Sequence, residues 1–289
     1  MKVLIIFITI FFNFCALSQL PEPLSTRLLS TSGAGVGAIL LNESTILNPA
    51  SAIFFNTSSF YYQKDDFTLN DDGDETSLLD NSHQEIYSII DDSTSAKGGF
   101  SYIHQYFNGE RRKRYSLSLS RPLGKKSSIG LIYKFTDAHL DNEYLKLHQF
   151  LIGFTHVQSN QLSFGLTIND PQFRVDEDFK ITAGIQYTFS EMISFLYDIG
   201  TGDMENPDKK SFNLWAIQVG VFKDFFIRYG GGTSNFEGAR YQSWGVSWTG
   251  PRLSLEYAYR NSDHKDTDYA FLQDNESLDQ HSFALTILF

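Results

Sequence analysis

The sequence predicts an all-β fold, a transmembrane antiparallel β-barrel of about 14 strands with an N-terminal plug (hatch) segment. Three observations predict it. Apolar and polar residues alternate along many short segments, long and short connections alternate between those segments, and the chain begins like an exported protein. The composition agrees, because 26 Phe and 15 Tyr occur at a mean hydropathy of only −0.23, so apolar residues must be interleaved with polar ones.

The first 18 residues predict a cleaved secretory signal peptide. Lys2 precedes the apolar run 3–14, and small residues follow it. We expect cleavage after Ser18, which divides the chain into a signal peptide (1–18), an N-terminal hatch (19–56) and a barrel (57–289). Because Cys15 is the only cysteine, the mature chain is expected to contain no disulfide and no cysteine metal site.

The hatch is predicted from residues 32–55. Gly33, Gly35 and Gly37 stand at alternate positions, where glycine permits a tight turn or a close approach to another surface. The spacing also suits phosphate binding, but a dinucleotide fold needs a strand before the glycines and a βαβ unit around them. The rest of the chain predicts no such unit, so a structural or gating role is favoured.

The end of the hatch predicts a short helical turn. Asn48 is a good helix N-cap, Pro49 suits the first helical position, and Ala50 begins a run of small residues that can continue the turn. We expect this turn to lead residues 53–55 into the first strand.

Fourteen segments show the period-two alternation of β-strands. Within 181–189, for example, Ile, Ala, Ile, Tyr and Phe alternate with Thr, Gly, Gln and Thr. An even number of strands is what a bacterial single-chain barrel requires. The predicted strands are 57–63, 82–90, 97–107, 113–120, 127–136, 145–156, 161–168, 180–189, 192–199, 211–222, 225–231, 240–248, 252–260 and 281–289.

Alternation alone fits a soluble periplasmic β-sandwich equally well, so the connections decide between the two folds. A barrel with both chain ends in the periplasm turns its long loops outward, whereas a sandwich has no reason to sort loops by length. The long connections are predicted at 64–81, 137–143, 169–179, 200–210, 232–239 and 261–280. The short ones are predicted at 122–126, 158–161, 190–191, 223–224 and 249–251.

The alternation also predicts which side chains face lipid and which face the lumen. Aromatic residues near strand ends are expected to form interfacial girdles, namely Tyr61, Tyr102, Tyr115, Tyr133, Tyr187, Trp215, Trp244, Trp248 and Tyr259. A charge on the lipid face would cost roughly 2–4 kcal/mol at the midplane. The charged residues expected in the lumen are Lys134, Asp198, Arg228, Glu256 and Arg260. There they either pair with each other or with the hatch, or simply fill a closed lumen.

A run of basic residues falls at the outer rim in this topology. Arg111, Arg112, Lys113 and Arg114 either hold lipopolysaccharide phosphates through charge-assisted hydrogen bonds or form a plain solvated cluster.

The segment with Asn48-Pro49-Ala50 after a glycine-rich start, followed by about fourteen strands, resembles the long-chain fatty acid transporter (FadL-like) superfamily of outer-membrane proteins. It also resembles the PorV-type branch of that superfamily, which is associated with type IX secretion. The terminal Phe289 after alternating apolar residues fits the same group. The resemblance implies a hatch inside the barrel, passage of a hydrophobic molecule past it, and recognition of the terminal aromatic by the barrel-assembly machinery.

We therefore expect a transporter or channel for small hydrophobic, fatty-acid-like compounds in a Gram-negative-type outer membrane. The alternative is a non-transporting barrel that anchors or shuttles a secreted or surface protein. The seven histidines are scattered and Ser247 lacks the second glycine of a nucleophile elbow, so no enzyme, catalytic residue, metal site or cofactor is expected. A net charge of −11 argues against nucleic acid as a partner.

Overall fold

A computed structural model describes residues 21–71, 74–76, 82–93, 95–107, 109–140, 143–173, 179–190, 192–235, 237–264 and 276–289. The predicted signal peptide lies outside the described residues. No helix in these ranges is long and apolar enough to cross a bilayer.

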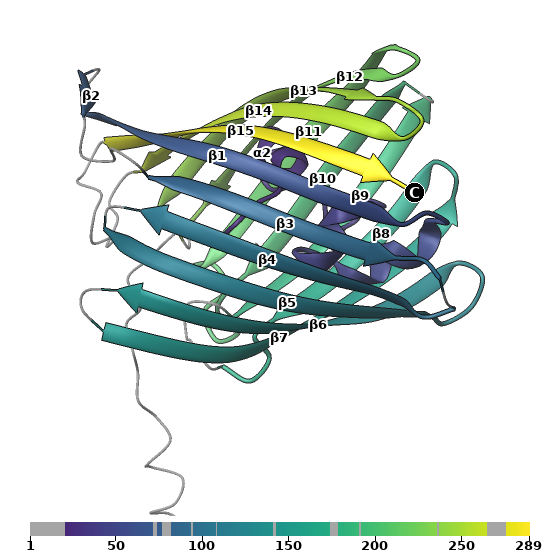
Figure 1. The fold of residues 1–289 in the computed structure, drawn as a ribbon, viewed down its shortest axis with the longest axis horizontal. Coiled ribbons are helices and arrows are strands. Elements are labelled where there is room, and N and C mark those ends of the chain that lie inside the picture. Colours follow the sequence, from purple (N-terminus) through teal and green to yellow (C-terminus); the bar gives the residue numbers. More distant parts are fainter. Residues whose placement is uncertain are drawn as a thin grey trace, which may run out of the picture.

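The strands form one closed antiparallel sheet (Figure 1). Apart from one short strand, each strand pairs with the strands before and after it in the chain, and the first pairs with the last, from Ser59 opposite Leu288 to Asp71 opposite Glu276. Of the fifteen strands, β2 (Asp74–Thr76) only prolongs a hairpin from β1, which leaves fourteen in the barrel. The others are β1 (Ser59–Asp71), β3 (His83–Asp91), β4 (Lys97–Phe107), β5 (Glu110–Pro122), β6 (Ser127–Leu140), β7 (Glu143–Ser159), β8 (Leu162–Asn169), β9 (Lys180–Ser190), β10 (Ile193–Thr201), β11 (Ser211–Phe222), β12 (Phe225–Ser234), β13 (Ala239–Thr249), β14 (Leu253–His264) and β15 (Glu276–Leu288).

The fourteen-strand closed barrel predicted from the sequence is thus confirmed, but several strands are longer than expected. Residues 64–71 continue β1, and β6 and β7 run through most of 137–143, so the loops predicted there are wrong. In β1 the alternation simply continues, because Phe67 and Leu69 lie on the same face as Tyr61 and are buried with it. The long connections 72–82, 170–179, 202–210 and 265–275 nevertheless lie at one end of the barrel, although two connections at that end, 108–109 and 141–142, are as short as the turns at the other end.

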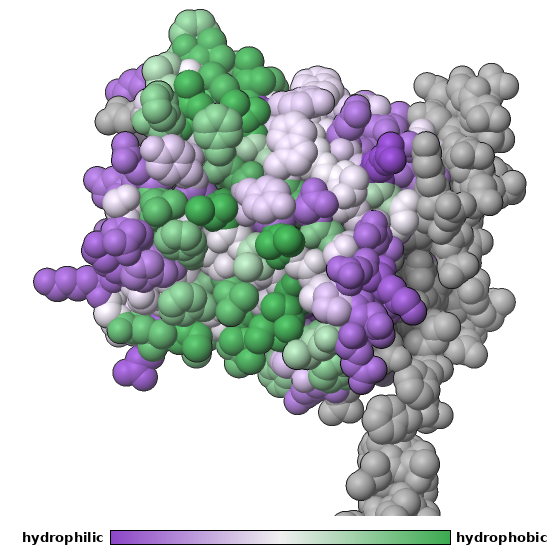
Figure 2. All heavy atoms as spheres, turned by 180° about the vertical axis from the view of Figure 1, so that it is seen from behind, coloured by the Kyte–Doolittle hydropathy of each residue, from purple (hydrophilic) through white to green (hydrophobic). Residues whose placement is uncertain are grey.

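The barrel wall has its polar face inside and its apolar face outside. In β8, Ser163 and Thr167 are buried, whereas Phe164 and Leu166 are 39% and 41% exposed. Figure 2 shows apolar side chains spread across the outer wall, with hydrophilic ones gathered mainly toward the two ends. Such a surface would be unstable in water and suits a barrel that is surrounded by lipid.

Most of the predicted girdle aromatics face outward. Tyr61 does not, because it lies on the inward face of β1, is 2% exposed and donates its hydroxyl to Gln63. The prediction for this residue is therefore wrong. The outward-facing, exposed members of the predicted girdles are Tyr115, Tyr187, Trp215, Trp244 and Trp248, while Tyr102, Tyr133 and Tyr259 are half-buried.

Residues 21–58 contact the inward faces of strands on all sides of the barrel. They contain α2 (Thr26–Ser30) and two 3₁₀ helices, η1 (Asn42–Thr45) and η2 (Pro49–Phe54). Figure 1 shows these helices between the near strands and the fainter far strands. Nearly all side chains of α2 and η1 are buried.

The helical turn predicted at the end of this segment is confirmed. Asn48 caps η2, since its side-chain Oδ1 accepts a hydrogen bond from the backbone N–H of Ala50 at 3.1 Å, and Pro49 occupies the first helical position. Residues 53–54 still belong to η2, and β1 begins only at Ser59. The expected direct entry of 53–55 into the first strand is therefore wrong.

Candidate functional site

A cavity of about 180 Å³ lies inside the barrel. Its wall comes from the ends of β9–β15 that lead to the longer connections, and its remaining lining comes from the N-terminal segment. The apolar lining is Pro21, Leu24, Gly33, Val36, Leu47, Phe212, Leu214 and Leu278. The polar lining is Glu22, Ser32, Lys180, Thr182, Asp198, Ser234, Glu237, Tyr241, Arg260, Ser262, His264 and Gln280.

The apolar side of the cavity continues into a buried cluster between the N-terminal segment and the wall. Its members are Leu28, Ala34, Ala38, Leu40, Leu196 and Ala216, with Leu24, Leu47 and Leu214 packed against them. Burial of apolar surface stabilises by about 0.8 kcal/mol per CH₂ group. The cluster therefore holds the segment against β10 and β11 while three of its side chains still face the cavity.

The polar side of the cavity is a connected group of charges. Lys180 Nζ lies 3.2 Å from Glu237 Oε1, and the Tyr241 hydroxyl donates to the other oxygen of that carboxylate. Burial raises the pKa of Glu237, but the charge of Lys180 and the hydrogen bond from Tyr241 outweigh it and hold that pKa below its usual range. Glu237 is accordingly ionised at neutral pH.

Arg260 completes this polar side. Its guanidinium carbon lies 4.0 Å from the centre of the Tyr241 ring, a cation–π contact. Its Nε–H has no hydrogen-bond partner among the described residues. Arg260 thus places a cation in the wall of the cavity, beside the carboxylate of Glu237 that Lys180 already neutralises.

Glu22 joins the opposite side of the cavity to the wall. Its Oε1 accepts from Arg114 Nη1 at 2.7 Å and lies 3.9 Å from Lys134 Nζ. Burial would raise the pKa of Glu22, but Arg114, Lys134 and Arg112 together hold it well below its usual range. The start of the segment is therefore held by an ionised carboxylate among three cations.

Asp198 fixes the middle of the segment. Its Oδ2 accepts hydrogen bonds from the backbone N–H groups of Gly35 at 2.7 Å and Val36 at 2.8 Å. Nearby, Asn48 Nδ2 donates to the Val36 carbonyl at 2.9 Å and to Thr155 Oγ1 at 3.1 Å. Two predicted residues of the hatch and one predicted lumen charge are thus brought together at one place.

Glycines of the wall let the segment approach closely. A Cβ at Gly165 would lie 1.9 Å from the Val36 carbonyl oxygen, and one at Gly37 would lie 2.5 Å from the backbone of Gly184. Pro49 fits against Gly130 in the same way, since a Cβ there would meet Pro49 Cβ at 2.7 Å. The segment and three strands therefore meet backbone to backbone, which any side chain would prevent.

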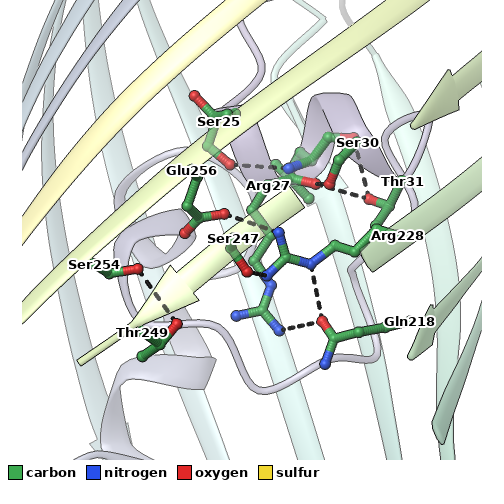
Figure 3. A network of polar contacts seen from close by, with 12 residues as sticks. Ser25, Arg27, Ser30, Thr31, Gln218, Arg228, Ser247, Thr249, Ser254 and Glu256 are labelled. Carbon is green, nitrogen blue, oxygen red and sulfur yellow. Dashed lines mark hydrogen bonds and ion pairs between the residues drawn. The ribbon is translucent and has the colours of Figure 1, made fainter. Parts of the chain in front are cut away.

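Arg228 and Glu256, both expected in the lumen, pair at 3.0 Å in the half of the barrel that carries the short turns (Figure 3). Arg228 also donates to Gln218 at 2.9 Å and to Ser247 at 2.9 Å. Arg27 of α2 reaches the same Gln218 oxygen at 3.4 Å. This network joins the segment to the wall on the far side from the cavity.

The basic run at the outer rim is divided by the strand it lies in. Arg111 and Lys113 are on the outward face of β5, whereas Arg112 donates to Gln105 at 2.6 Å on the inward face and Arg114 holds Glu22. A single outward patch of all four residues is therefore wrong, because successive side chains of a strand point to opposite faces. Contact of Arg111 and Lys113 with lipopolysaccharide stays a prediction.

Several residues of the site were not expected from the sequence. Asp65, placed in a predicted loop, is buried on the inward face of β1 and accepts from Gln63 at 2.7 Å and from Gln84. Glu237 and His264 also lay in predicted loops. For His264 a signal existed, because it continues the period-two series of Glu256 and Arg260 along β14.

The described ranges contain no group of three His, Cys, Asp or Glu side chains placed to hold a metal ion. Phe289 is 69% exposed, and its backbone pairs with Ser58 in both directions, at 3.0 and 3.1 Å.

No protein-family model matches the chain, and no curated protein matches it in sequence. Its fold is similar to solved structures. The CymD monoaromatic hydrocarbon channel superposes with a TM-score of 0.66 at 11% identity, covering 92% of this chain and 97% of that one. The Pseudomonas putida toluene transporter TodX gives a TM-score of 0.66 at 11% identity, covering 94% of this chain and 99% of that one. A Pseudomonas aeruginosa FadL homologue gives 0.61 at 10%, covering 94% and 99%. The likeness to the FadL fold is thus confirmed.

Proposed function

We propose that this chain is an outer-membrane transporter for small hydrophobic compounds, with residues 21–56 acting as its plug. The cavity of about 180 Å³ carries the proposal, because it lies between that segment and the longer connections inside a barrel with an apolar outer wall. The similar structures named as a monoaromatic hydrocarbon channel and a toluene transporter support it. Export through the signal peptide and assembly through Phe289 belong to the same proposal.

The size of the cavity limits which substrates it can enclose. An apolar cavity of about 150 Å³ in another protein accepts benzene, so about 180 Å³ suits one aromatic ring or a short alkyl chain. A long-chain fatty acid would not be enclosed. Of the fatty-acid-like compounds, we therefore propose only short ones.

The mixed lining adds a preference for one polar group on the substrate. Val36 and Leu214 offer an apolar surface, and Arg260 brings the positive charge of its guanidinium to the other side. A carboxylate would accept a charge-assisted hydrogen bond there, whereas a hydrocarbon would use the apolar surface alone. A small aromatic carboxylate such as 4-methylbenzoate fits both sides.

Calorimetric titration of the detergent-solubilised chain tests this binding site. We expect 4-methylbenzoate to bind more tightly than palmitate, and Arg260→Gln to weaken 4-methylbenzoate about 10- to 100-fold while leaving toluene unchanged, as loss of a charged hydrogen bond implies. Arg240→Gln, an exposed outward arginine on β13, is the matched control. Equal losses in the two variants would contradict the assignment of Arg260.

Transport itself is tested in liposomes that contain the purified barrel. Deleting residues 19–48 is expected to leave a folded, heat-modifiable barrel with increased permeability. Unchanged permeability would argue against the plug. Absence of both binding and uptake of every small compound would revive the expected alternative, an anchor or shuttle for a secreted protein.

A further inference from the structure

The outward face of β4–β7 carries cations near the end with the longer connections. We name Arg111, Lys113 and Lys146 the basic patch, with His104 and His139 beside it. In the strand register Lys113 lies opposite His104 and Asp137, Arg111 lies opposite His139, and Lys146 lies opposite Asp137. Opposite side chains of one face have Cβ atoms about 5 Å apart, so the three cations span roughly 10 Å, two strand spacings.

This concentration of positive charge is local. With histidine neutral, the basic patch and Asp137 leave a charge of +2 on a chain whose net charge is −11. The outward positions of β8–β12 in the described residues hold no charged side chain. On β13–β15, β1 and β3 they hold Arg240 and Lys64 together with the acids Asp263, Asp279, Asp66, Glu85 and Asp91.

The cations of the basic patch are available to a ligand. Within the described ranges, none of Arg111, Lys113 and Lys146 forms an ion pair with a carboxylate, and Arg111 and Lys146 are exposed. By contrast, Lys64 on β1 lies 3.7 Å from Asp66.

Aromatic side chains fix the depth of the patch. Next to it, one step toward the middle of the wall, ring centres of Tyr102 and Tyr115 lie 5.1 Å apart, and those of Tyr115 and Phe135 6.2 Å apart. Amphipathic aromatic rings prefer the level of the lipid headgroups. The cations of the basic patch lie one residue pair closer to the end of the barrel than these rings. They are therefore at the level of the headgroup phosphates.

We propose that the basic patch binds the phosphates of lipid A, the anionic glycolipid of the outer leaflet. The patch lies on the side of the longer connections, which face outward in such barrels, so the lipid of that leaflet is its occupant. Arg111 can hold a phosphate through two parallel hydrogen bonds, while Lys113 and Lys146 act as point charges. This inference rests on the outer-membrane orientation of the proposed function and not on transport.

The test compares two variants of the full chain in nanodiscs of phosphatidylcholine, to which diphosphoryl lipid A is titrated. Arg111→Glu with Lys113→Glu is expected to weaken binding at least 10-fold. Arg240→Glu with Lys64→Glu changes the same number of outward charges on other strands and is expected to stay within twofold of the wild type. Equal losses, or no loss in the first variant, would overturn the proposal.

A second measurement uses only the wild-type barrel, so it tests the proposal even if the double variant of Arg111 and Lys113 does not fold. The wild-type barrel is expected to bind diphosphoryl lipid A at least 10-fold more tightly than dephosphorylated lipid A or phosphatidylglycerol. Equal binding of the dephosphorylated lipid would overturn a phosphate site, and tighter binding of phosphatidylglycerol would overturn the choice of lipid A. Transport assays on the same preparations separate these outcomes from failure of the proposed function.

Discussion

Glu22 and Asp198 show how single carboxylates hold the N-terminal segment. Asp198 accepts hydrogen bonds from two backbone N–H groups of the segment, and Glu22 lies among cations of the wall. Both also line the cavity. A ligand in the cavity is thus placed beside the two contacts that keep the segment in position.

The lowered pKa of Glu22 has a defined consequence for pH. A carboxyl group whose pKa is lower in the folded state stabilises that state above its usual pKa of about 4.5, and the contribution fades as pH falls below this value. We therefore expect Glu22→Gln to lower the thermal midpoint of the barrel at pH 7, and the difference from the wild type to shrink as pH falls from about 4.5 toward 2. Because the side chain is partly exposed, the effect at pH 7 is expected to be small, about 1 kcal/mol or less.

Circular dichroism melts across this pH range measure the difference. Glu205→Gln, in an exposed loop, is the control and should melt like the wild type throughout. A difference for Glu22→Gln that stays constant from pH 7 to pH 2 would contradict the role of its charge.

At the same scale, the period of two was enough to place Lys134, Asp198, Arg228 and Glu256 on the inward face, where all four are buried. It could not say which charge meets which, because the partners lie on different strands or on the N-terminal segment. Asp65 was missed for a related reason. Strands are recognised in the sequence by apolar residues at alternate positions. Asp65 occupies such a position of β1 with a polar side chain, so it gave no sign that the strand continues.

Among the elements, the short strand β8 shows how the wall is shaped to its contents. Gly165 lies so close to the carbonyl group of Val36 that no side chain would fit between them. A larger residue at position 165 would leave the hydrogen bonds between the strands of the wall in place, but it would force the N-terminal segment to move.

We expect Gly165→Ala to raise the single-channel conductance of the barrel in planar bilayers, while the barrel stays folded and heat-modifiable. The cause is a clash of the new methyl group with the backbone at Val36. Gly98→Ala is the matched control, since a Cβ there meets nothing closer than 3.8 Å. Equal conductance of the two variants would show that the segment does not limit the pore.

The elements were predicted better than their ends. All fourteen strands follow from alternation, but β1, β6, β7 and β14 extend past their predicted ends, because polar residues occur on both faces near the ends of the strands and weaken the alternation. The helical turn at Asn48 was found because capping is local. The path of the N-terminal segment through the barrel could not be predicted, since it depends on long-range contacts such as the hydrogen bond between Asn48 and Thr155, which are 107 positions apart in the sequence.

For the whole molecule, closure depends on the two ends of the barrel sequence. β1 pairs with β15 along thirteen residue pairs, and Phe289 adds two backbone hydrogen bonds to Ser58 beyond them. The exposed terminal ring lies outside this pairing. The ring can therefore be removed without loss of the backbone pairing that closes the barrel.

We expect Phe289→Ala to lower the assembled fraction in outer-membrane preparations several-fold, with Phe289→Tyr close to the wild type, because the alanine variant keeps the backbone pairing and loses only the ring. Heat-modifiable migration on gels measures the fraction. Refolding of the purified alanine variant in detergent should be unimpaired. A failure there would mean that the ring stabilises the barrel instead of directing its assembly.

The contact between Thr26 and Ser282 has a consequence for how the chain folds. Their hydroxyl oxygens lie 2.6 Å apart although 256 positions separate them, so this contact of α2 can form only when the last strand is in place. Contacts of such long sequence separation make folding slow. We therefore expect the wall to close around the N-terminal segment during biogenesis, so that the segment is enclosed as the last strand pairs with the first.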